Sequence, residues 1–172
     1  MVRHWIFVTS PENYEVCKKY NVFGADSRYK IAVTEHINPG DLVFFYVTKK
    51  REFRGPYKIV DRGYYDPDHQ AVENWKSPRK QVRYEYIIPL ERLVNRDLRI
   101  PLEKVFDKLL FITNKKGFKK RSFRGVRGGY TDHFQFSIIS IRKEDFDTLL
   151  QFVFEKEQDL LKKLFAELKD QN

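Results

Sequence analysis

Cysteine is scarce in this sequence, and its histidines are not clustered. The chain contains one cysteine, Cys17, and four histidines, at positions 4, 36, 69 and 133. A single cysteine cannot form an internal disulfide, which suits a reducing compartment and predicts a cytoplasmic protein. No two histidines have the short spacing of a metal pair on one helix face, and with a lone cysteine the usual zinc templates are excluded. We therefore expect no metal and no other cofactor.

Long hydrophobic runs and catalytic motifs are also missing. No apolar stretch approaches the ~20 residues of a membrane span, and a strand pattern begins at once, leaving no room for a signal peptide. The sequence has no GxSxG elbow, no P-loop and no GxGxxG that opens a helix after a strand. Asp66, Asp68 and His69 make a metal-dependent nuclease conceivable, but a polar loop explains them more simply. These absences favour a binding protein over an enzyme.

Acidic residues are absent from one long segment, Lys108 to Thr131. Its cations are Lys108, Lys115, Lys116, Lys119, Lys120, Arg121, Arg124 and Arg127, and they are interleaved with Phe118, Phe123 and Tyr130 and with four glycines. Cations contact phosphates, rings stack on bases, and glycines let the backbone approach a ligand closely. This combination predicts a loop that binds nucleic acid.

Positive charge is concentrated in the body of the chain. The net charge is +9, but residues 143–172 carry −3, so residues 1–142 carry +12. Two further cationic groups are Lys49, Lys50, Arg51 and Arg54, then Lys76, Arg79, Lys80 and Arg83. We expect these loops to share one rim that holds a polyanion. The alternative is the solvated, Lys-rich surface of a protein from a thermophile, a composition to which the low Met and Cys content also points.

Alternating apolar stretches predict a small α+β domain. Strands are expected over 3–9, 42–48, 57–65, 82–88 (ended by Pro89) and 134–141. A helix should start at Ser10 as its cap, with Pro11 first, and run to about Tyr20. Residues 22–24 and 66–81 are expected as loops, a second short helix near 26–35, and a helical turn over 101–110. Five or six such strands suggest a small, strongly curved mixed sheet or barrel with flanking helices.

The last 30 residues predict one long amphipathic helix. It should begin at Lys143 and end near residue 169, with an apolar stripe at 3.6-residue spacing. Such a helix is ~40 Å long, so its second half, from about Glu155, should overhang a body of this size. We divide the chain into a domain over 1–142 and this helix over 143–172. The overhang could fold back on the body, form a dimer contact or lead to a further domain.

The order of several short motifs resembles a known family. His4-Trp5-Ile6-Phe7-Val8 is followed by Thr9 to Asn13, then Lys19 to Gly24, the turn Pro39-Gly40-Asp41 and, late in the chain, Phe111 to Lys116. Over residues 3–150 this resembles the EVE domains of archaea and bacteria, which belong to the PUA-like superfamily together with YTH and ASCH domains. The resemblance implies a small barrel-like sheet that binds nucleic acid and reads a modified base. Related domains also supply DNA recognition in McrB-type restriction proteins.

The resemblance also implies a base pocket. Phe23 and Trp75 stand where YTH domains carry the tryptophans of their aromatic cage, and Gly24 stands where a small polar residue contacts the base. Asn13 and Ser10 match positions that touch the base edge. Thr113 and Asn114 are added as further candidates for that edge. We expect Phe23 and Trp75 to sandwich the base.

These observations predict a module that recognises a flipped, methylated base in DNA or RNA, plausible as the specificity domain of a modification-dependent restriction system. The backbone would be held by Lys49, Lys50, Arg51, Arg54, Lys76, Arg79, Lys115, Lys116, Lys119, Lys120, Arg121, Arg124 and Arg127. The alternative is an RNA-binding PUA/ASCH-type module that reads shape and phosphates without a base pocket. A protein-interaction domain that works through the terminal helix also stays open.

Overall fold

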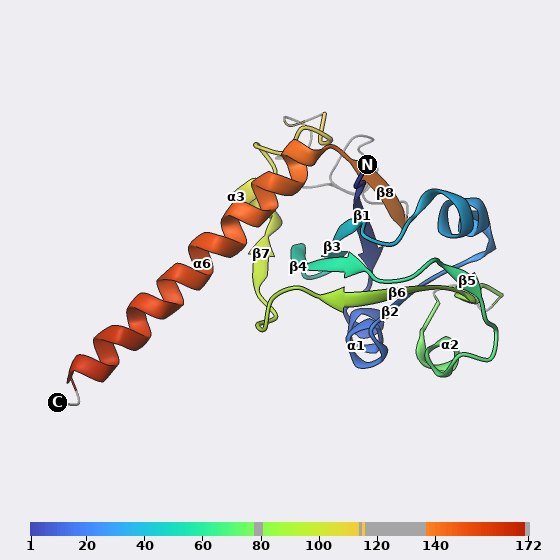
Figure 1. Cartoon of the computed structure of the whole chain (residues 1–172), viewed down its shortest axis with the longest axis horizontal. Coiled ribbons are helices and arrows are strands. Elements are labelled where there is room, and N and C mark those ends of the chain that lie inside the picture. Colours follow the sequence, from blue (N-terminus) through green and yellow to red (C-terminus); the bar gives the residue numbers. More distant parts are fainter. Residues whose placement is uncertain (78–80, 114, 116–136, 171–172) are drawn as a thin grey trace.

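The fold is a curled mixed sheet flanked by helices (Figure 1). The computed structural model describes residues 1–77, 81–113, 115 and 137–170, without the side chains of 160, 161 and 163–170. The strands are β1 His4–Thr9, β2 Val22–Ala25, β3 Leu42–Val47, β4 Glu52–Ile59, β5 Tyr64–Tyr65, β6 Tyr86–Arg92, β7 Arg99–Pro101 and β8 Ile138–Ile141. Their main path is β2-β6-β4-β3-β1-β8, with β5 on β6 and β7 on β4. Only the β1–β3 pair, among those described, is parallel. The predicted α+β class with a curved mixed sheet is confirmed.

Helices cover both faces of this sheet. They are α1 Pro11–Tyr20, a 3₁₀ turn Ser27–Tyr29, a π-helical turn Ala32–His36, α2 Gln70–Asn74, α3 Leu102–Val105 and α6 Lys143–Asp170. Neighbouring residues of a strand point to opposite faces. Phe7 and Phe45 therefore join the cluster beside α1, while Ile6 and Phe44 join the cluster beneath α6. This explains why the central strands are apolar throughout, because neither face is open to water.

Helix α1 begins and ends where its sequence predicts. The Ser10 hydroxyl accepts a hydrogen bond from the Asn13 amide at 3.2 Å, and Pro11 occupies the first helical position. Asn21 ends the helix in a left-handed conformation (φ 53°), which asparagine tolerates better than most residues. The chain therefore leaves β1, turns at Ser10 and returns beneath the sheet within a few residues.

Several expected boundaries were wrong. Residues 22–24, expected as a loop, belong to β2, because Val22 to Ala25 pair with β6. Pro89 lies inside β6: it lacks an N–H, but its carbonyl accepts from the Val60 amide at 3.1 Å and keeps the strand paired. The strand expected over 57–65 is split between β4 and β5, and the loop expected over 66–81 contains α2. Of the strand expected over 134–141, β8 occupies the last four residues, and residues 134–136 lie outside the described part.

Helix α6 confirms the long terminal helix. Phe146, Leu149 and Val153 bury one stripe of its first half against the body. The second half runs on past the sheet, so the C-terminal end lies far from the body (Figure 1). Among the helices of the described residues, none is long and apolar enough to cross a membrane.

Candidate functional site

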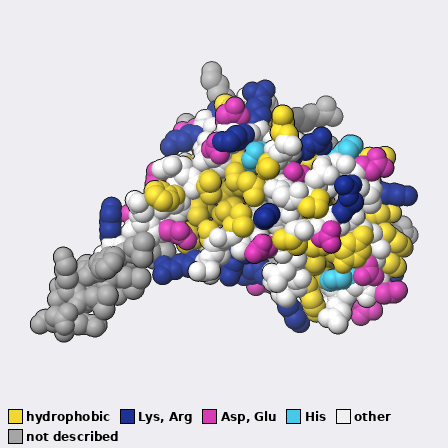
Figure 2. Space-filling view, viewed as in Figure 1, with side chains coloured by type: hydrophobic (Ala, Val, Ile, Leu, Met, Phe, Trp, Pro, Cys, Tyr) yellow, Lys and Arg dark blue, Asp and Glu magenta, His cyan; other side chains and the backbone are white. Residues whose placement is uncertain are grey.

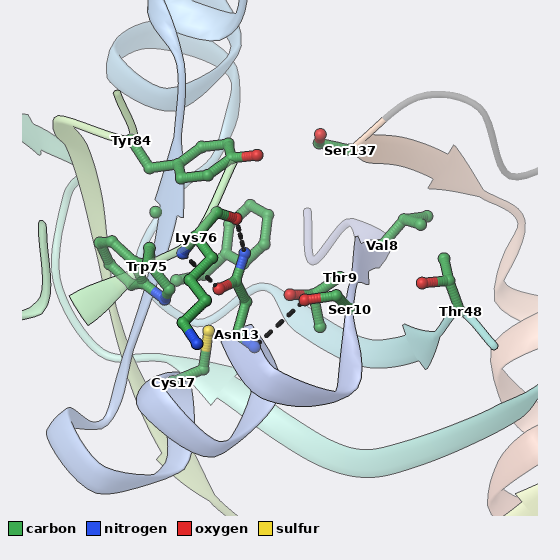
Figure 3. Close-up of a pocket in the computed structure, with 12 residues that line it drawn as sticks. Val8, Thr9, Ser10, Asn13, Cys17, Thr48, Trp75, Lys76, Tyr84 and Ser137 are labelled. Atoms are coloured by element: carbon green, nitrogen blue, oxygen red, sulfur yellow. Dashed lines mark hydrogen bonds between the residues drawn. The ribbon is translucent and has the colours of Figure 1, made fainter. Parts of the chain in front are cut away.

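A small hollow lies where β1 ends and α1 begins (Figure 3). Its volume is about 180 Å³, well below the ~300–1,000 Å³ typical of pockets for drug-sized ligands. The lining residues are Val8, Thr9, Ser10, Asn13, Cys17, Phe23, Gly24, Thr48, Trp75, Lys76, Tyr84 and Ser137. They come from β1, α1, β2, the turn after β3, the segment after α2, and residues just before β6 and β8. Most of the polar groups are hydroxyls, so the hollow can test hydrogen bonds without carrying a fixed negative charge.

Asn13 fastens the segment after α2 to α1. Its side-chain amide donates to the Lys76 carbonyl at 2.8 Å and accepts from the Lys76 amide at 2.8 Å (Figure 3). An amide has two N–H donors and two acceptor lone pairs, so one of each is left over. Asn13 and Ser10, both expected at the base edge, do line the hollow, but each is also engaged in a structural bond. The two hydrogen bonds between Asn13 and Lys76 hold Trp75 and Lys76 beside α1.

The Trp75 ring packs against the backbone of Gly24. A β-carbon built on Gly24 would lie 2.3 Å from the Trp75 ring, so any side chain there would force the indole aside. Trp75 is 8% exposed, and its ring meets the Tyr84 ring edge-to-face, with centroids 6.4 Å apart. Glycine at position 24 is thus explained by the close approach of the indole to β2, and Trp75 forms one wall of the hollow.

Phe23 does not form the opposite half of a sandwich. It is 3% exposed and stacks on Phe7, with centroids 4.4 Å apart and planes 20° apart. Its edge also meets Phe45 in the core. One ring face is therefore occupied by Phe7, and Phe23 contributes to the floor of the hollow. The expected Phe23–Trp75 sandwich is corrected on this point.

The ring that sequence reasoning missed is Tyr84. It stands at the edge of the hollow and its hydroxyl points into the open space on the Ser137 side (Figure 3). The alternation of residues 82–88 carried a signal for it, because Tyr84 and Tyr86 fall on the same side of an extended chain. Thr9, Thr48 and Ser137 were missed as well, since lone hydroxyl residues carry no recognisable spacing.

The side chains with reactive potential in this region have structural roles. Burial raises the pKa of the Cys17 thiol to about 12, so it stays protonated and is a poor nucleophile at neutral pH. His69 caps α2, because its Nδ1 accepts from the Ala71 amide at 3.1 Å, and Asp66 accepts from the Asp68 amide at 3.1 Å. In the part of the chain that the structure describes, no three His, Cys, Asp or Glu residues gather as a metal site would require.

Three of the expected backbone-binding cations lie beside the hollow. Lys49 and Lys50 directly follow Thr48, which lines it, and Lys76 lines it too. The Lys49 side chain is 73% exposed and 3.9 Å from Glu12. Arg51 is in the same turn, with its guanidinium 3.4 Å from Glu103.

Three other expected contacts are corrected. Arg54 lies inside β4, is 6% exposed and is paired with Glu52 and Asp97, so it cannot reach a ligand. The Lys115 ammonium donates to the carbonyls of Phe106, Asp107 and Leu109. Lys115 therefore stabilises the segment that follows α3. Thr113 is exposed, follows Ile112 of the cluster beneath α6, and does not line the hollow.

The remaining predicted contacts lie outside the described residues. They are Arg79, Asn114, Lys116, Lys119, Lys120, Arg121, Arg124 and Arg127.

The chain is a small α+β domain, a curled mixed sheet flanked by helices with a hollow at the first strand–helix junction. The family model of the EVE domain matches residues 3–152. The chain therefore belongs to the EVE domain family, as the motif order predicted. UPF0310 protein PH1033 of Pyrococcus horikoshii is 35% identical over 52 residues, which cover 30% of this chain and 35% of that protein. The match thus spans about a third of this relative.

Solved structures share the fold at low sequence identity. A hypothetical protein from Leishmania major has a TM-score of 0.53 at 14% identity, covering 91% of this chain and 98% of that one. Human THYN1, in complex with DNA containing 5-methylcytosine, has a TM-score of 0.51 at 19% identity (87% and 96% covered). The YTH domain of Zygosaccharomyces rouxii MRB1, in complex with N6-methyladenosine RNA, has a TM-score of 0.52 at 13% identity (88% and 89% covered).

Proposed function

We propose that this chain binds nucleic acid and reads one flipped, modified base in the hollow beside α1. The observation that carries the proposal is the wall formed by Trp75, with hydroxyls around it and Lys76 beside it. Two proteins of the same fold support it, because THYN1 is bound to DNA with 5-methylcytosine and the YTH domain to RNA with N6-methyladenosine. A role as the specificity domain of a modification-dependent restriction system would follow if the preferred ligand is methylated DNA.

The hollow suits a single base and nothing larger. Its volume of about 180 Å³ excludes a stretch of stacked nucleotides. A base that leaves its stack loses a few kcal/mol, and stacking on an aromatic ring returns ~1–3 kcal/mol. Trp75 supplies that ring, and Tyr84 borders the opening. The base therefore gains enough on one face to offset most of the cost of flipping.

Hydroxyl groups then test the edge of the base. Ser10 lines the hollow while its oxygen caps α1. Thr9, Thr48 and Ser137 offer further donors and acceptors at the margin of the hollow. A wrong base leaves one of these groups desolvated without a partner, at a cost of ~1–3 kcal/mol. The hollow thus discriminates between bases in two ways: by the contact area that a base buries and by the polar groups that a wrong base leaves without a hydrogen bond.

A methyl group on the base should improve binding modestly. One buried methyl contributes ~0.8 kcal/mol, about fourfold in affinity. Fluorescence anisotropy with short single- and double-stranded DNA and RNA, each with and without one methylated cytosine or adenine, measures this preference. We expect one modified oligonucleotide to bind at least fourfold more tightly than its unmodified partner. Equal affinities throughout would instead favour a module that reads shape and phosphates.

The lysines beside the hollow should act on all sequences alike. Lys49→Ala with Lys50→Ala should weaken modified and unmodified oligonucleotides equally and flatten the dependence of log Kd on log salt by about 0.7–0.9 per lost phosphate contact. Lys104→Ala with Lys143→Ala is the matched control, because it removes the same charge from exposed residues beside α6. An identical loss in both double variants would mean that net charge, and not this turn, determines affinity.

A further inference from the structure

Helix α6 leaves an apolar strip uncovered. Its buried stripe packs on the body, but Leu150 and Phe154 are 40% and 55% exposed. These two residues are one turn apart on the same side of the helix. Figure 2 shows hydrophobic side chains at the surface of α6 just before the helix leaves the body. The first two residues of the strip, Leu150 and Phe154, are therefore exposed in the structure.

The sequence continues this strip with coiled-coil spacing. From Leu150 and Phe154 the series runs to Leu161, Leu164 and Leu168, at intervals of four, seven, three and four residues, and only Glu157 interrupts it. Alternating steps of three and four place residues along one seam of a helix. The backbone of α6 is helical over this whole stretch. A seam of this kind is stable in water only when a second helix covers it.

The overhang also lacks support from its own chain. Figure 1 shows no sheet or helix beside the far half of α6 among the described elements. A free helix of fewer than ~12–15 residues is marginal in water, since packing provides most helical stability. The half beyond Glu155 is about that long. A helix of this length therefore needs packing against a partner to be stable in water.

The charges on α6 indicate which partner. Near the start of α6, Asp145 is buried against the Leu110 and Phe111 amides and Asp147 pairs with Lys143. The acidic charge of the overhang therefore comes from Glu155, Glu157 and Asp159, with Lys156 as the one basic residue among them. Lys156 is engaged with the body, because its ammonium donates to the Arg99 carbonyl. From Leu160 to its end at Asp170 the helix carries three lysines and two acidic residues, and Lys162 and Lys163 lie together near the start of this segment. An antiparallel second copy would lay the acidic segment of each helix along the basic segment of the other.

We propose that two copies of this chain pair through an antiparallel coiled coil of α6, with Leu150, Phe154 and the apolar positions beyond them at the seam. The interface is held by burial of the seam and oriented by opposite charges at its margins. It lies on the opposite side of the sheet from the hollow beside α1, so each copy keeps its own pocket accessible.

Molecular mass in solution tests the pairing. Light scattering of the full chain after size exclusion should show a rise from monomer towards dimer between on the order of 1 and 100 μM, the range expected of a short coiled coil. Phe154→Asp should remain monomeric, while its oligonucleotide affinity stays within twofold of wild type. A monomeric wild-type chain throughout this range, or a dimeric Phe154→Asp variant, would overturn the proposal.

Charge exchange tests the orientation. Lys162→Glu with Lys163→Glu, and separately Glu155→Lys with Glu157→Lys, should each dimerise at least tenfold more weakly, because like charges then face one another. An equimolar mixture of the two variants restores opposite charges on both sides of the pair and should recover the dimer. If either variant dimerises as tightly as wild type, or if the mixture stays monomeric, the antiparallel arrangement is wrong. None of these outcomes depends on the base-reading proposal.

Discussion

Trp75→Ala should weaken binding to the preferred modified oligonucleotide by tenfold or more. The substitution removes the ring that walls the hollow, and the stacking lost is worth ~1–3 kcal/mol. The loss should fall on base recognition, so affinity for an unmodified strand and the slope of its salt dependence should change much less. Titration of both oligonucleotides at two salt concentrations separates the two contributions.

The same substitution also affects stability, and this must be controlled. Trp75 is 8% exposed and packs on Gly24, so truncation to alanine leaves a cavity and costs ~3–5 kcal/mol of unfolding free energy. Trp75→Phe is the matched control, because it keeps a stacking face with less lost volume and should retain part of the preference. Thermal unfolding of both variants establishes that they are folded at the assay temperature. Unchanged affinity of a folded Trp75→Ala chain would contradict base reading in this hollow.

Local sequence signals predicted the elements that frame the hollow. The apolar run of β1, the Ser10 cap and Pro11 are adjacent in sequence, and they place Ser10 and Asn13 on the pocket wall. Gly24 and Trp75 were predicted to belong together through the family resemblance, and they touch in the structure. The sequence therefore predicts contacts between residues that are close in the chain, and contacts between residues that the order of family motifs brings together.

Contacts set by distant partners were not accessible. Phe23 lies at the bottom of the hollow because Phe7 stacks on one face of its ring. The residues next to Phe23 in the sequence do not indicate whether its ring is buried or exposed. In the sequence, Arg54 belongs to a run of cations that predicts an exposed surface. Strand β4 begins at Glu52, however, so Arg54 is drawn inward, where Asp97, more than forty positions later, neutralises it. Charge runs in a sequence predict a surface only when no buried carboxylate is available to pair with them.

The pairing of Arg54 with Asp97 is a second contact with a large expected effect on stability. Asp97 accepts hydrogen bonds from the Arg54 guanidinium at 2.9 Å, the Tyr14 hydroxyl at 2.8 Å and the Lys18 ammonium at 2.8 Å. The Arg54 side chain is 7% exposed. A fully unpaired buried charge typically costs ~3–5 kcal/mol, but Asp97→Ala leaves Glu52 as a partner of Arg54, so its cost should be about 2–3 kcal/mol. We expect a loss of that size in the unfolding free energy at pH 7, measured with urea.

The pH dependence of unfolding identifies the charge as the cause. Burial alone would raise the pKa of Asp97, but hydrogen bonds from Arg54, Lys18 and Tyr14 outweigh it and hold the pKa well below its usual value. A depressed pKa in the folded state means that the stabilisation is complete above the unfolded pKa of about 4 and declines as the pH falls below it. Asp97→Asn, which keeps the shape and removes the charge, should therefore differ most from wild type at pH 7 and approach it near pH 2–3. The exposed Asp61→Asn serves as control and should change stability by less than about 0.5 kcal/mol at either pH. A constant difference between Asp97→Asn and wild type across this range would mean that lost packing, and not the ion pair, explains the effect.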